Sequence, residues 1–244
     1  MAIIKQNLPE KEKIIIKAII FDLDDTLVKT SKLYNQARED FYQLIKKYEI
    51  TSSNIEKVLN KLDEIDIKNV LKYGFSRERY PISLGETYEF FAKRNEQKID
   101  EKIRKEFEEI GWKVYQKVPE LVEDVYFVLD LLVKKYTLVL ATLGDPIVQE
   151  NKLKLTGLKK YFSKVYIMKY KNIEEYEDII KEMKLKRQET WLVGNSIRSD
   201  LNPGLKLGLN CILIPFFAWK FEEEKPISNN FLQLNSLKEI LNYL

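Results

Sequence analysis

The chain has 244 residues, 45% of them hydrophobic and 32% charged, which suits a globular protein with one large domain or a core and a smaller domain. Its 41 Lys and Arg nearly balance its 38 Asp and Glu, and no dense basic block indicates nucleic acid as a partner. The lack of histidine and the single cysteine exclude Ser-His-Asp triads, His-ligated zinc and intrachain disulfides, so any catalysis falls to carboxylates, lysines and hydroxyls.

The N-terminal stretch MAIIKQNLPEKEK turns charged at once and lacks the long apolar segment of a secretory signal. Further along, charged residues interrupt each apolar run before it reaches the ~18 residues of a membrane span. We therefore expect a cytoplasmic protein with no membrane partner.

The first predicted strand, residues 14–21, is an apolar run that ends in three carboxylates, Asp22, Asp24 and Asp25. Like charges this close repel, and burying an unpaired carboxylate is costly. Because alternate residues of an extended segment share a face, Asp22 and Asp24 can address one site while Asp25 points elsewhere. We interpret Asp25 as a hydrogen-bond acceptor that shapes the turn.

Residues 31–118 place apolar side chains at helical spacing, which predicts several helices and no obvious strand. A break at residues 73–86 is marked by glycine and proline. It carries Arg77 and Arg79, which we expect in an exposed charged loop; the alternative is that they contact an anionic substrate.

From residue 119 onward, short apolar strands alternate with helices. The strands are predicted at residues 136–142, 164–168, 190–194 and 210–215, and the helices at residues 120–135, 145–156, 173–184 and 203–208. This alternation predicts an α/β fold, in which a parallel sheet has helices on both faces. The expected core spans residues 1–30 and 119–244, and residues 31–118 form an all-helical domain inserted after the first strand.

Ligands of open parallel sheets bind beyond the carboxyl ends of the strands. The polar side chains that follow the predicted strands are Asp22 and Asp24, Thr142, Lys169 or Lys171, and those of residues 195–200. Candidates from four distant segments are therefore expected to converge on one edge of the sheet.

Four short motifs occur in a fixed order along these segments: FDLDDTLV, LATLGD, a lysine near position 171, and VGNSIRSD. With a helical block between the first two, this layout resembles the haloacid dehalogenase superfamily, particularly its phosphatases with a helical cap after the first motif. The resemblance covers nearly the whole chain. It implies a Rossmann-like core, a cap domain, and Mg²⁺-dependent hydrolysis of a small phosphorylated metabolite through an aspartyl phosphate.

The resemblance also implies roles for two of the acids and one lysine. Asp22 is expected to attack phosphorus, and Asp24 to protonate the leaving oxygen and then activate water. Crowding suits this pair, because repulsion favours one carboxyl staying protonated. We assign the lysine to Lys171, because KNIEEY opens the following helix where the family places it, and keep Lys169 as the fallback.

The phosphoryl group is expected to be bound by the hydroxyl of Thr142 and by the backbone N–H of Leu143 or Gly144. The family usually has Asn where this chain has Leu143, a departure that is tolerable if only the backbone is used. Taken alone, a threonine here indicates only a strand.

A carboxylate that attacks an anionic phosphate needs a cation between them, and Mg²⁺ suits oxygen ligands. The resemblance implies a side-chain oxygen of Asp22, the backbone carbonyl of Asp24, and Asp200 as ligands. Position 195 departs from the family, with Asn195 where Asp is usual. An amide oxygen can coordinate a metal or bond its water, but it brings no charge.

Three alternatives remain open at this point. A phosphotransferase or phosphomutase of the same family would deliver the phosphoryl group to an acceptor other than water. A dehalogenase is disfavoured, because cleavage of a carbon–halogen bond needs neither an acid at Asp24 nor a metal. A catalytically silent binding protein would use the same cleft, and Asn195 is the feature that favours it.

Overall fold

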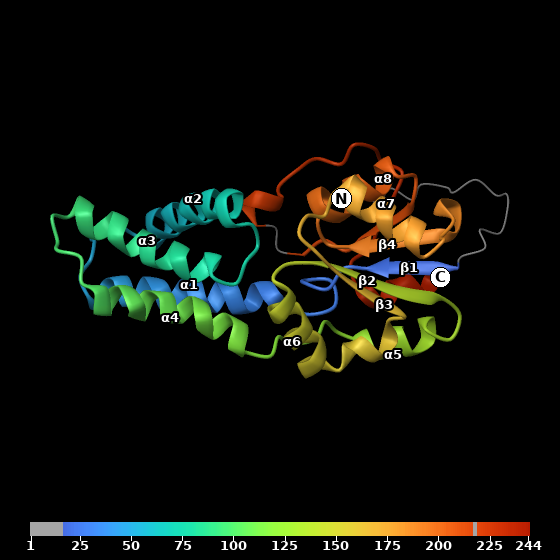
Figure 1. Cartoon of the computed structure of the whole chain (residues 1–244), viewed down its shortest axis with the longest axis horizontal. Helices are drawn as coiled ribbons and strands as arrows, with labels where there is room; N and C mark the ends of the chain where they lie inside the picture. Colours follow the sequence, from blue (N-terminus) through green and yellow to red (C-terminus); the bar gives the residue numbers. More distant parts are fainter. Residues whose placement is uncertain (1–16, 217–218) are drawn as a thin grey trace.

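The computed structural model describes residues 17–216 and 219–244, which form a helical unit beside an α/β unit (Figure 1). Strand β1 (Ala18–Phe21) opens the α/β unit, and all of its residues are buried. The predicted strand at residues 14–21 thus ends where expected, while its beginning, up to residue 16, lies outside the described residues.

The α/β unit contains one parallel six-stranded sheet in the order β3-β2-β1-β4-β5-β6. After β1, its strands are β2 (Thr137–Leu143), β3 (Lys164–Met168), β4 (Thr190–Gly194), β5 (Asn210–Leu213) and β6 (Leu232–Gln233). The predicted parallel sheet is confirmed. Strand β6 was not predicted, because its two residues are too few to show a pattern.

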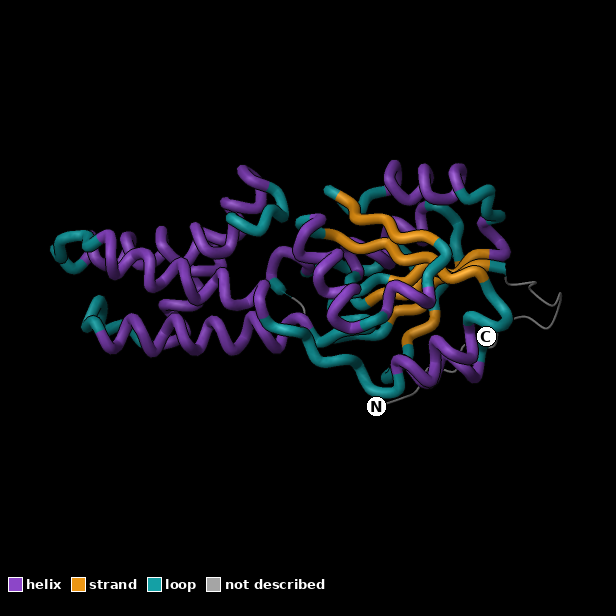
Figure 2. Tube along the Cα trace, turned by 60° about the horizontal axis from the view of Figure 1, so that its bottom comes forward, coloured by secondary structure: helices purple, strands orange, loops and turns teal. Residues whose placement is uncertain are grey.

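Helices cover both faces of this sheet, as predicted for a Rossmann-like core (Figure 2). They are α5 (Val125–Leu132), α6 (Pro146–Thr156), α7 (Ile173–Glu182) and α8 (Asn202–Lys206). Alternation along β1 separates two cores: Ile19 and Phe21 pack with α5 and α6, whereas Ile20 packs with α7 and α8. Every helix in the two described ranges is too short or too polar to cross a membrane.

The helix predicted at residues 120–135 begins later than expected, at Val125. The chain before it pairs with the segment that follows β1: Val122 N–H donates to Leu27 O at 3.0 Å, and Lys29 N–H donates to Glu120 O at 2.7 Å. These bonds hold residues 120–122 in an extended conformation. The amphipathic sequence pattern that predicted the helix therefore begins before the helix itself. They also tie together the points where the chain leaves and re-enters the α/β unit.

Between β1 and α5, four helices form the helical insert, α1 (Thr30–Lys47), α2 (Ile55–Tyr73), α3 (Arg79–Arg94) and α4 (Glu101–Gln116). The insert has its own hydrophobic core. Phe107 lies at its centre, with ring centroids 5.1 Å from Phe41 and 5.0 Å from Tyr88. The insert is all-helical, and its division from the core at residues 31 and 118 stays a prediction.

The break predicted at residues 73–86 is shorter in the structure, because α3 already begins at Arg79. Pro81 lies in the first turn of α3. Backbone N–H groups in a first turn have no acceptor within the helix, so the N–H that proline lacks is not missed there. Gly85 lies inside α3 for a packing reason: a Cβ there would come 3.1 Å from Oε1 of Glu108 on α4. Both residues serve the helix rather than a loop.

Candidate active site

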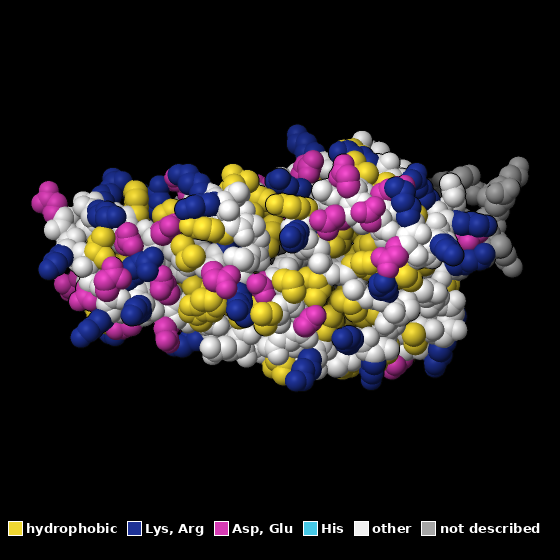
Figure 3. All heavy atoms as spheres, in the orientation of Figure 1, with side chains coloured by type: hydrophobic (Ala, Val, Ile, Leu, Met, Phe, Trp, Pro, Cys, Tyr) yellow, Lys and Arg dark blue, Asp and Glu magenta, His cyan; other side chains and the backbone are white. Residues whose placement is uncertain are grey.

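A cavity of about 480 Å³ lies between the helical insert and the carboxyl ends of the strands. On the face drawn in Figure 3, hydrophobic side chains gather where the two units meet. The cavity is lined by most of the residues predicted for the site, namely Asp22, Asp24, Leu143, Lys171, Asn195 and Asp200. Thr142 is fully buried at the end of β2. The structure therefore brings together the side chains that the sequence placed on four separate segments.

Asp22 directly follows β1, and its N–H donates to Val193 O at 2.9 Å, which continues the pairing with β4. Its carboxylate is buried and accepts from Lys171 Nζ at 2.5 Å and from Thr26 Oγ1 at 2.8 Å. Burial raises the pKa of Asp22 to about 7; Lys171 opposes this rise, and the nearby charge of Asp200 adds to it. An additional cation in the cavity would favour the ionised form.

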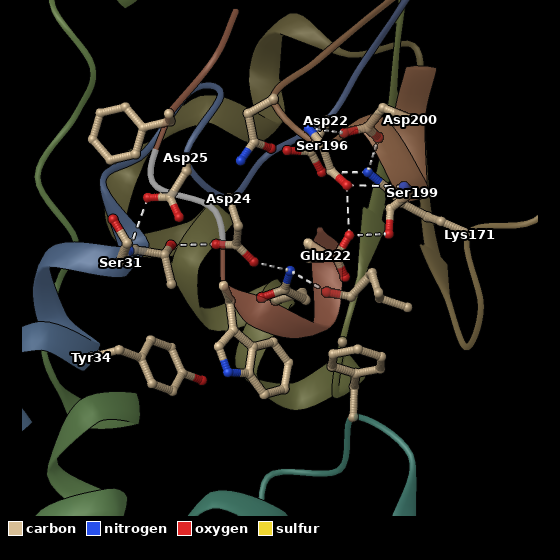
Figure 4. A pocket seen from close by; sticks show the side chains of 18 of the residues that line it. Asp22, Asp24, Asp25, Ser31, Tyr34, Lys171, Ser196, Ser199, Asp200 and Glu222 are labelled. Carbon is tan, nitrogen blue, oxygen red and sulfur yellow. Dashed lines mark hydrogen bonds and ion pairs between the residues drawn. The ribbon is translucent and has the colours of Figure 1, made fainter. Parts of the chain in front are cut away.

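Lys171 is buried between two acids, and its Nζ donates to Asp22 Oδ1 at 2.5 Å and to Asp200 Oδ1 at 2.6 Å (Figure 4). Burial lowers the pKa of this ammonium, but Asp200 and Asp22 outweigh burial and hold the pKa well above its usual range. Tyr176 also donates to Asp200 Oδ1, at 3.0 Å. Of the two lysines considered, Lys171 reaches the site, whereas Lys169 is exposed.

Asp24 is anchored through contacts different from those of Asp22. Its carboxylate accepts from Gln149 Nε2 at 2.8 Å, from Lys152 Nζ at 2.7 Å and from the hydroxyl of Thr30. Burial raises the pKa of Asp24, but the charge of Lys152 and these three hydrogen bonds outweigh it, so the pKa lies below its usual value. Sequence reasoning missed Gln149 and Lys152, although their spacing of three places both on one face of the helix after LATLGD.

Asp25 points away from the other two acids, toward Ser31 (Figure 4). Its Oδ1 accepts from the backbone N–H of Ser31 at 2.9 Å, at the start of α1. Its backbone adopts a left-handed φ of 60°, which aspartate tolerates better than most residues. This geometry agrees with the interpretation of Asp25 as the acceptor that shapes the turn.

Thr142 and Leu143 end β2, and Leu143 lines the cavity whereas Thr142 is buried beside it. Gln149 Nε2 donates to Thr142 Oγ1 at 2.5 Å and to Leu143 O at 3.0 Å, so this amide connects the predicted phosphate-binding residues to Asp24. Of the two backbone amides left open by the sequence, that of Gly144 is engaged, since it donates to Met168 O at 3.3 Å.

Asp200 folds back over the end of β4 because Gly194 has no side chain. A Cβ at Gly194 would lie 2.3 Å from Cγ of Asp200, so no larger residue fits this position without moving the acid. Asp200 belongs to a short π-helical turn, Ile197–Leu201, and its Oδ2 accepts from the backbone N–H of Ser196 at 3.1 Å. The glycine of VGNSIRSD is therefore required because the side chain of Asp200 lies directly against the backbone at that position.

The residues expected to hold a divalent cation, Asp22, Asp24, Asn195 and Asp200, all line the cavity. Asp22 and Asp200 share the buried lysine, and Thr26 Oγ1 lies 2.8 Å from Asp22 Oδ2 and 3.3 Å from Asn195 Oδ1. Carboxylate, amide and carbonyl oxygens are the donors that Mg²⁺ prefers, so this set fits the ion. No cluster of three or more His, Cys, Asp or Glu suited to a metal occurs in the described ranges, so the donor set rests on two carboxylates.

The expectation that Arg79 lies in an exposed loop is wrong. Its side chain is buried, forms an ion pair with Asp66, and lies with its guanidinium 5.5 Å from the ring of Trp219. All three residues line the cavity. Arg77 is more exposed and pairs with Glu78. The partner of Arg79 comes from another helix, so the local sequence carried no sign of its burial.

A model of the haloacid dehalogenase-like hydrolase family matches residues 19–214, which include every predicted site residue. The chain belongs to this family. Glyceraldehyde 3-phosphate phosphatase from Methanocaldococcus jannaschii is a relative that is 25% identical over 235 residues, covering 93% of this chain and 96% of the relative. The family assigned by resemblance is confirmed, and the protein is a hydrolase.

Solved structures of this family share the fold over nearly the full length of the chain. A haloacid dehalogenase-like hydrolase from Xanthomonas campestris superposes with a TM-score of 0.73 at 23% identity, with 92% of each chain covered. A structure from Bacillus subtilis, described as a HAD-hydrolase bound to magnesium, superposes with a TM-score of 0.65 at 15% identity, covering 93% of this chain and 97% of the other. At these identities the likeness concerns the fold.

Proposed function

We propose that this family member is a Mg²⁺-dependent phosphatase that acts on a small phosphorylated metabolite through an aspartyl phosphate on Asp22. The observation that carries this proposal is the buried contact of Lys171 with Asp22 and Asp200 at the strand ends. This contact supports the proposal because it joins the proposed nucleophile Asp22 and the proposed metal ligand Asp200 to one fixed positive charge. The named activity of the archaeal relative and the magnesium in the Bacillus subtilis structure support the same proposal.

Phosphoryl transfer depends mainly on positioning and on neutralising the phosphoryl oxygens. Lys171 supplies one fixed positive charge. The hydroxyl of Thr142 accepts from Gln149 and keeps its own proton, which we propose is donated to the phosphoryl group. Mg²⁺, held by Asp22, Asn195, Asp200 and the backbone carbonyl of Asp24, supplies further positive charge when it is bound.

The reaction has two halves that use the same two acids. An oxygen of Asp22 attacks phosphorus, the bond from phosphorus to the leaving oxygen breaks, and Asp24 gives its proton to that oxygen. Asp24 then takes a proton from water as the water oxygen attacks phosphorus, which releases phosphate and frees Asp22. The contact of Asp24 with Lys152 favours the ionised form that accepts the proton in the second half.

The helical insert forms the other wall of the cavity and is proposed as the lid that selects the leaving group and excludes water. Its contribution to the lining includes Tyr34, Arg79 and Tyr115. A cavity of about 480 Å³ suits a metabolite rather than a polymer, which favours a small phosphate monoester as the substrate.

The test is release of inorganic phosphate from a panel of phosphorylated metabolites, including glyceraldehyde 3-phosphate, with Mg²⁺ or with a chelator. We expect turnover with Mg²⁺ alone, and we expect Asp22→Asn to lower kcat by about a thousandfold or more without unfolding the protein. Asp25→Asn, which changes the neighbouring acid of the turn, should stay within about tenfold of wild type.

Three results would redirect the proposal. Wild-type rates in Asp22→Asn would show that the nucleophile lies elsewhere. Loss of substrate phosphate to an organic acceptor, with little inorganic phosphate released, would identify a phosphotransferase or phosphomutase. No turnover with Mg²⁺, Mn²⁺ or Co²⁺ would favour the silent binding protein.

A further inference from the structure

Glu222, in the short 3-10 turn Lys220–Glu222 after β5, has a carboxylate that no step of the proposed reaction uses. Its Oε2 accepts from the hydroxyls of Ser196 and Ser199, both at 2.6 Å. Figure 4 shows Glu222 facing these two serines at the edge of the cavity. The serines lie in the loop that carries Asn195 and Asp200, which are the expected metal ligands contributed by VGNSIRSD.

Hydrogen bonds continue from Glu222 to Asp200. The backbone N–H of Ser196 donates to Asp200 Oδ2 at 3.1 Å, and the backbone N–H of Ser199 donates to Ser196 Oγ at 2.9 Å. Ser196 is therefore bonded both to the carboxylate of Glu222 and to that of Asp200. In the weakly screened interior of a cavity, such a chain brings the charge of Glu222 to bear on the metal-binding loop.

Among residues 17–216 and 219–244, no Lys or Arg forms an ion pair with the carboxylate of Glu222. Arg198 is near but is used differently, since its Nη1 donates to Phe221 O at 2.9 Å. A half-buried carboxylate without a cation is costly, and a cation in the cavity would offset that cost.

Contacts on both sides hold the turn in place. Phe221 packs against Phe75 of the insert with ring centroids 5.7 Å apart, and Arg198 lies 4.3 Å over the Phe221 ring. Lys220 Nζ donates to Asn60 Oδ1 of α2 at 2.7 Å. The position of Glu222 is thus fixed by both the core and the insert, as a positioning residue requires.

We propose that Glu222 supplies the metal site, through Ser196 and Ser199, with the negative charge that Asn195 does not bring. The proposal rests on the proposed function, since it requires that the site bind a divalent cation. With Asn195 as a neutral ligand, the direct donors carry the charge of Asp22 and Asp200. A third charge one hydrogen-bonded residue away strengthens cation binding without occupying a coordination position.

The test is a double-mutant cycle on metal affinity, measured by calorimetric titration of Mg²⁺ and of Mn²⁺ into the whole protein. We expect Glu222→Gln, which keeps the shape and one acceptor oxygen, to weaken binding about tenfold. Asn195→Asp should bring the affinity of Glu222→Gln back toward that of the wild type, because it returns one negative charge to the same loop. The loss in Glu222→Gln should shrink as ionic strength rises, because salt screens charge, whereas a purely structural role for Glu222 would give a loss that does not depend on salt.

The control is Glu223→Gln, which removes the same charge from the next, exposed residue and should change affinity by less than about twofold. Thermal unfolding of each variant checks the fold. Ser199→Ala is a second variant that breaks one bond to Glu222 and leaves its charge, and it should weaken binding less than Glu222→Gln.

Two results overturn the inference, and they can be told apart. Wild-type affinity in Glu222→Gln, or a loss of affinity that does not change with ionic strength, overturns the role of Glu222 and leaves a metal-dependent phosphatase standing. Failure of the wild-type protein to bind either cation overturns the inference together with the metal requirement of the proposed function.

Discussion

Lys171 is the residue on which the arrangement of acids depends. Burying two carboxylates and one ammonium is costly unless geometry is good, and Nζ lies 2.5 Å from Asp22 and 2.6 Å from Asp200. Both Lys169 and Lys171 follow β3 in the sequence. The local sequence pattern does not show which of them belongs to the site, and only the family resemblance favoured Lys171. The structure separates them by burial, because Lys171 turns into the cavity.

Lys152 influences the protonation state of Asp24. Burial raises the pKa of Asp24 and Lys152 outweighs it, so Lys152→Met should raise that pKa. Since the protonated form of Asp24 donates to the leaving group, activity falls as pH rises through its pKa. The alkaline limb of the kcat/KM profile should therefore move to higher pH in Lys152→Met.

The measurement is the pH profile for an alkyl phosphate, whose poor leaving group needs the proton. Lys154→Met, on the exposed side of the same helix, serves as the control and should leave the limb in place. An unshifted limb in Lys152→Met would mean that Asp24 is not the acid that this limb reports.

Between elements, the ion pair of Arg79 with Asp66 joins α3 to α2 inside the insert. Removing one partner of a buried pair leaves an uncompensated charge, so Arg79→Met should lower the free energy of unfolding by about 3 kcal/mol. Replacing both partners, in Arg79→Met/Asp66→Leu, should recover most of that loss. Denaturant unfolding of the three proteins measures both effects.

Arg77→Met removes a neighbouring, more exposed ion pair and should cost no more than about 1 kcal/mol. Equal losses in Arg77→Met and Arg79→Met would contradict the structural role assigned to the buried pair.

The elements also show where sequence patterns suffice. Strands at residues 164–168 and 190–194 were predicted with their observed bounds, because short β-branched runs between helices are read locally. The start of α5 was missed, because residues 120–122 bond to residues 27–29, which lie far away in the sequence. The burial of Arg79 depends on an acid of another helix and was missed for the same reason.

The residues of the candidate site also fall into those that sequence patterns predict and those that only three-dimensional contacts reveal. Residues at strand ends, such as Asp22 and Thr142, follow from the rule for parallel sheets and from the family motifs. Residues that act through a second residue, such as Gln149, Lys152 and Glu222, depend on three-dimensional contacts with Asp24, Ser196 and Ser199. The sequence pattern therefore predicted no role for these three residues.

In the whole molecule, the α/β unit with its two hydrophobic cores and the insert with its own core both contribute residues to the lining of the cavity that contains the acids. Backbone hydrogen bonds from Val122 to Leu27 and from Lys29 to Glu120 join the two segments that connect the units, and the turn that ends at Glu222 also contacts the insert. Under the proposed function, the reacting end of the substrate would lie at the sheet edge and its leaving group would face the insert.

Trapping of the phosphorylated enzyme tests the central claim most directly. Asp24→Asn should slow hydrolysis of the aspartyl phosphate, whereas an aryl phosphate with a good leaving group can still transfer its phosphoryl group without an acid. The variant is mixed with that substrate and Mg²⁺, quenched in acid, and mapped by mass spectrometry. We expect one phosphoryl group on Asp22 and none when Asp22→Asn is added. Turnover by the wild-type protein with no phosphoryl group on Asp22 in the trapped variant would contradict the proposed mechanism.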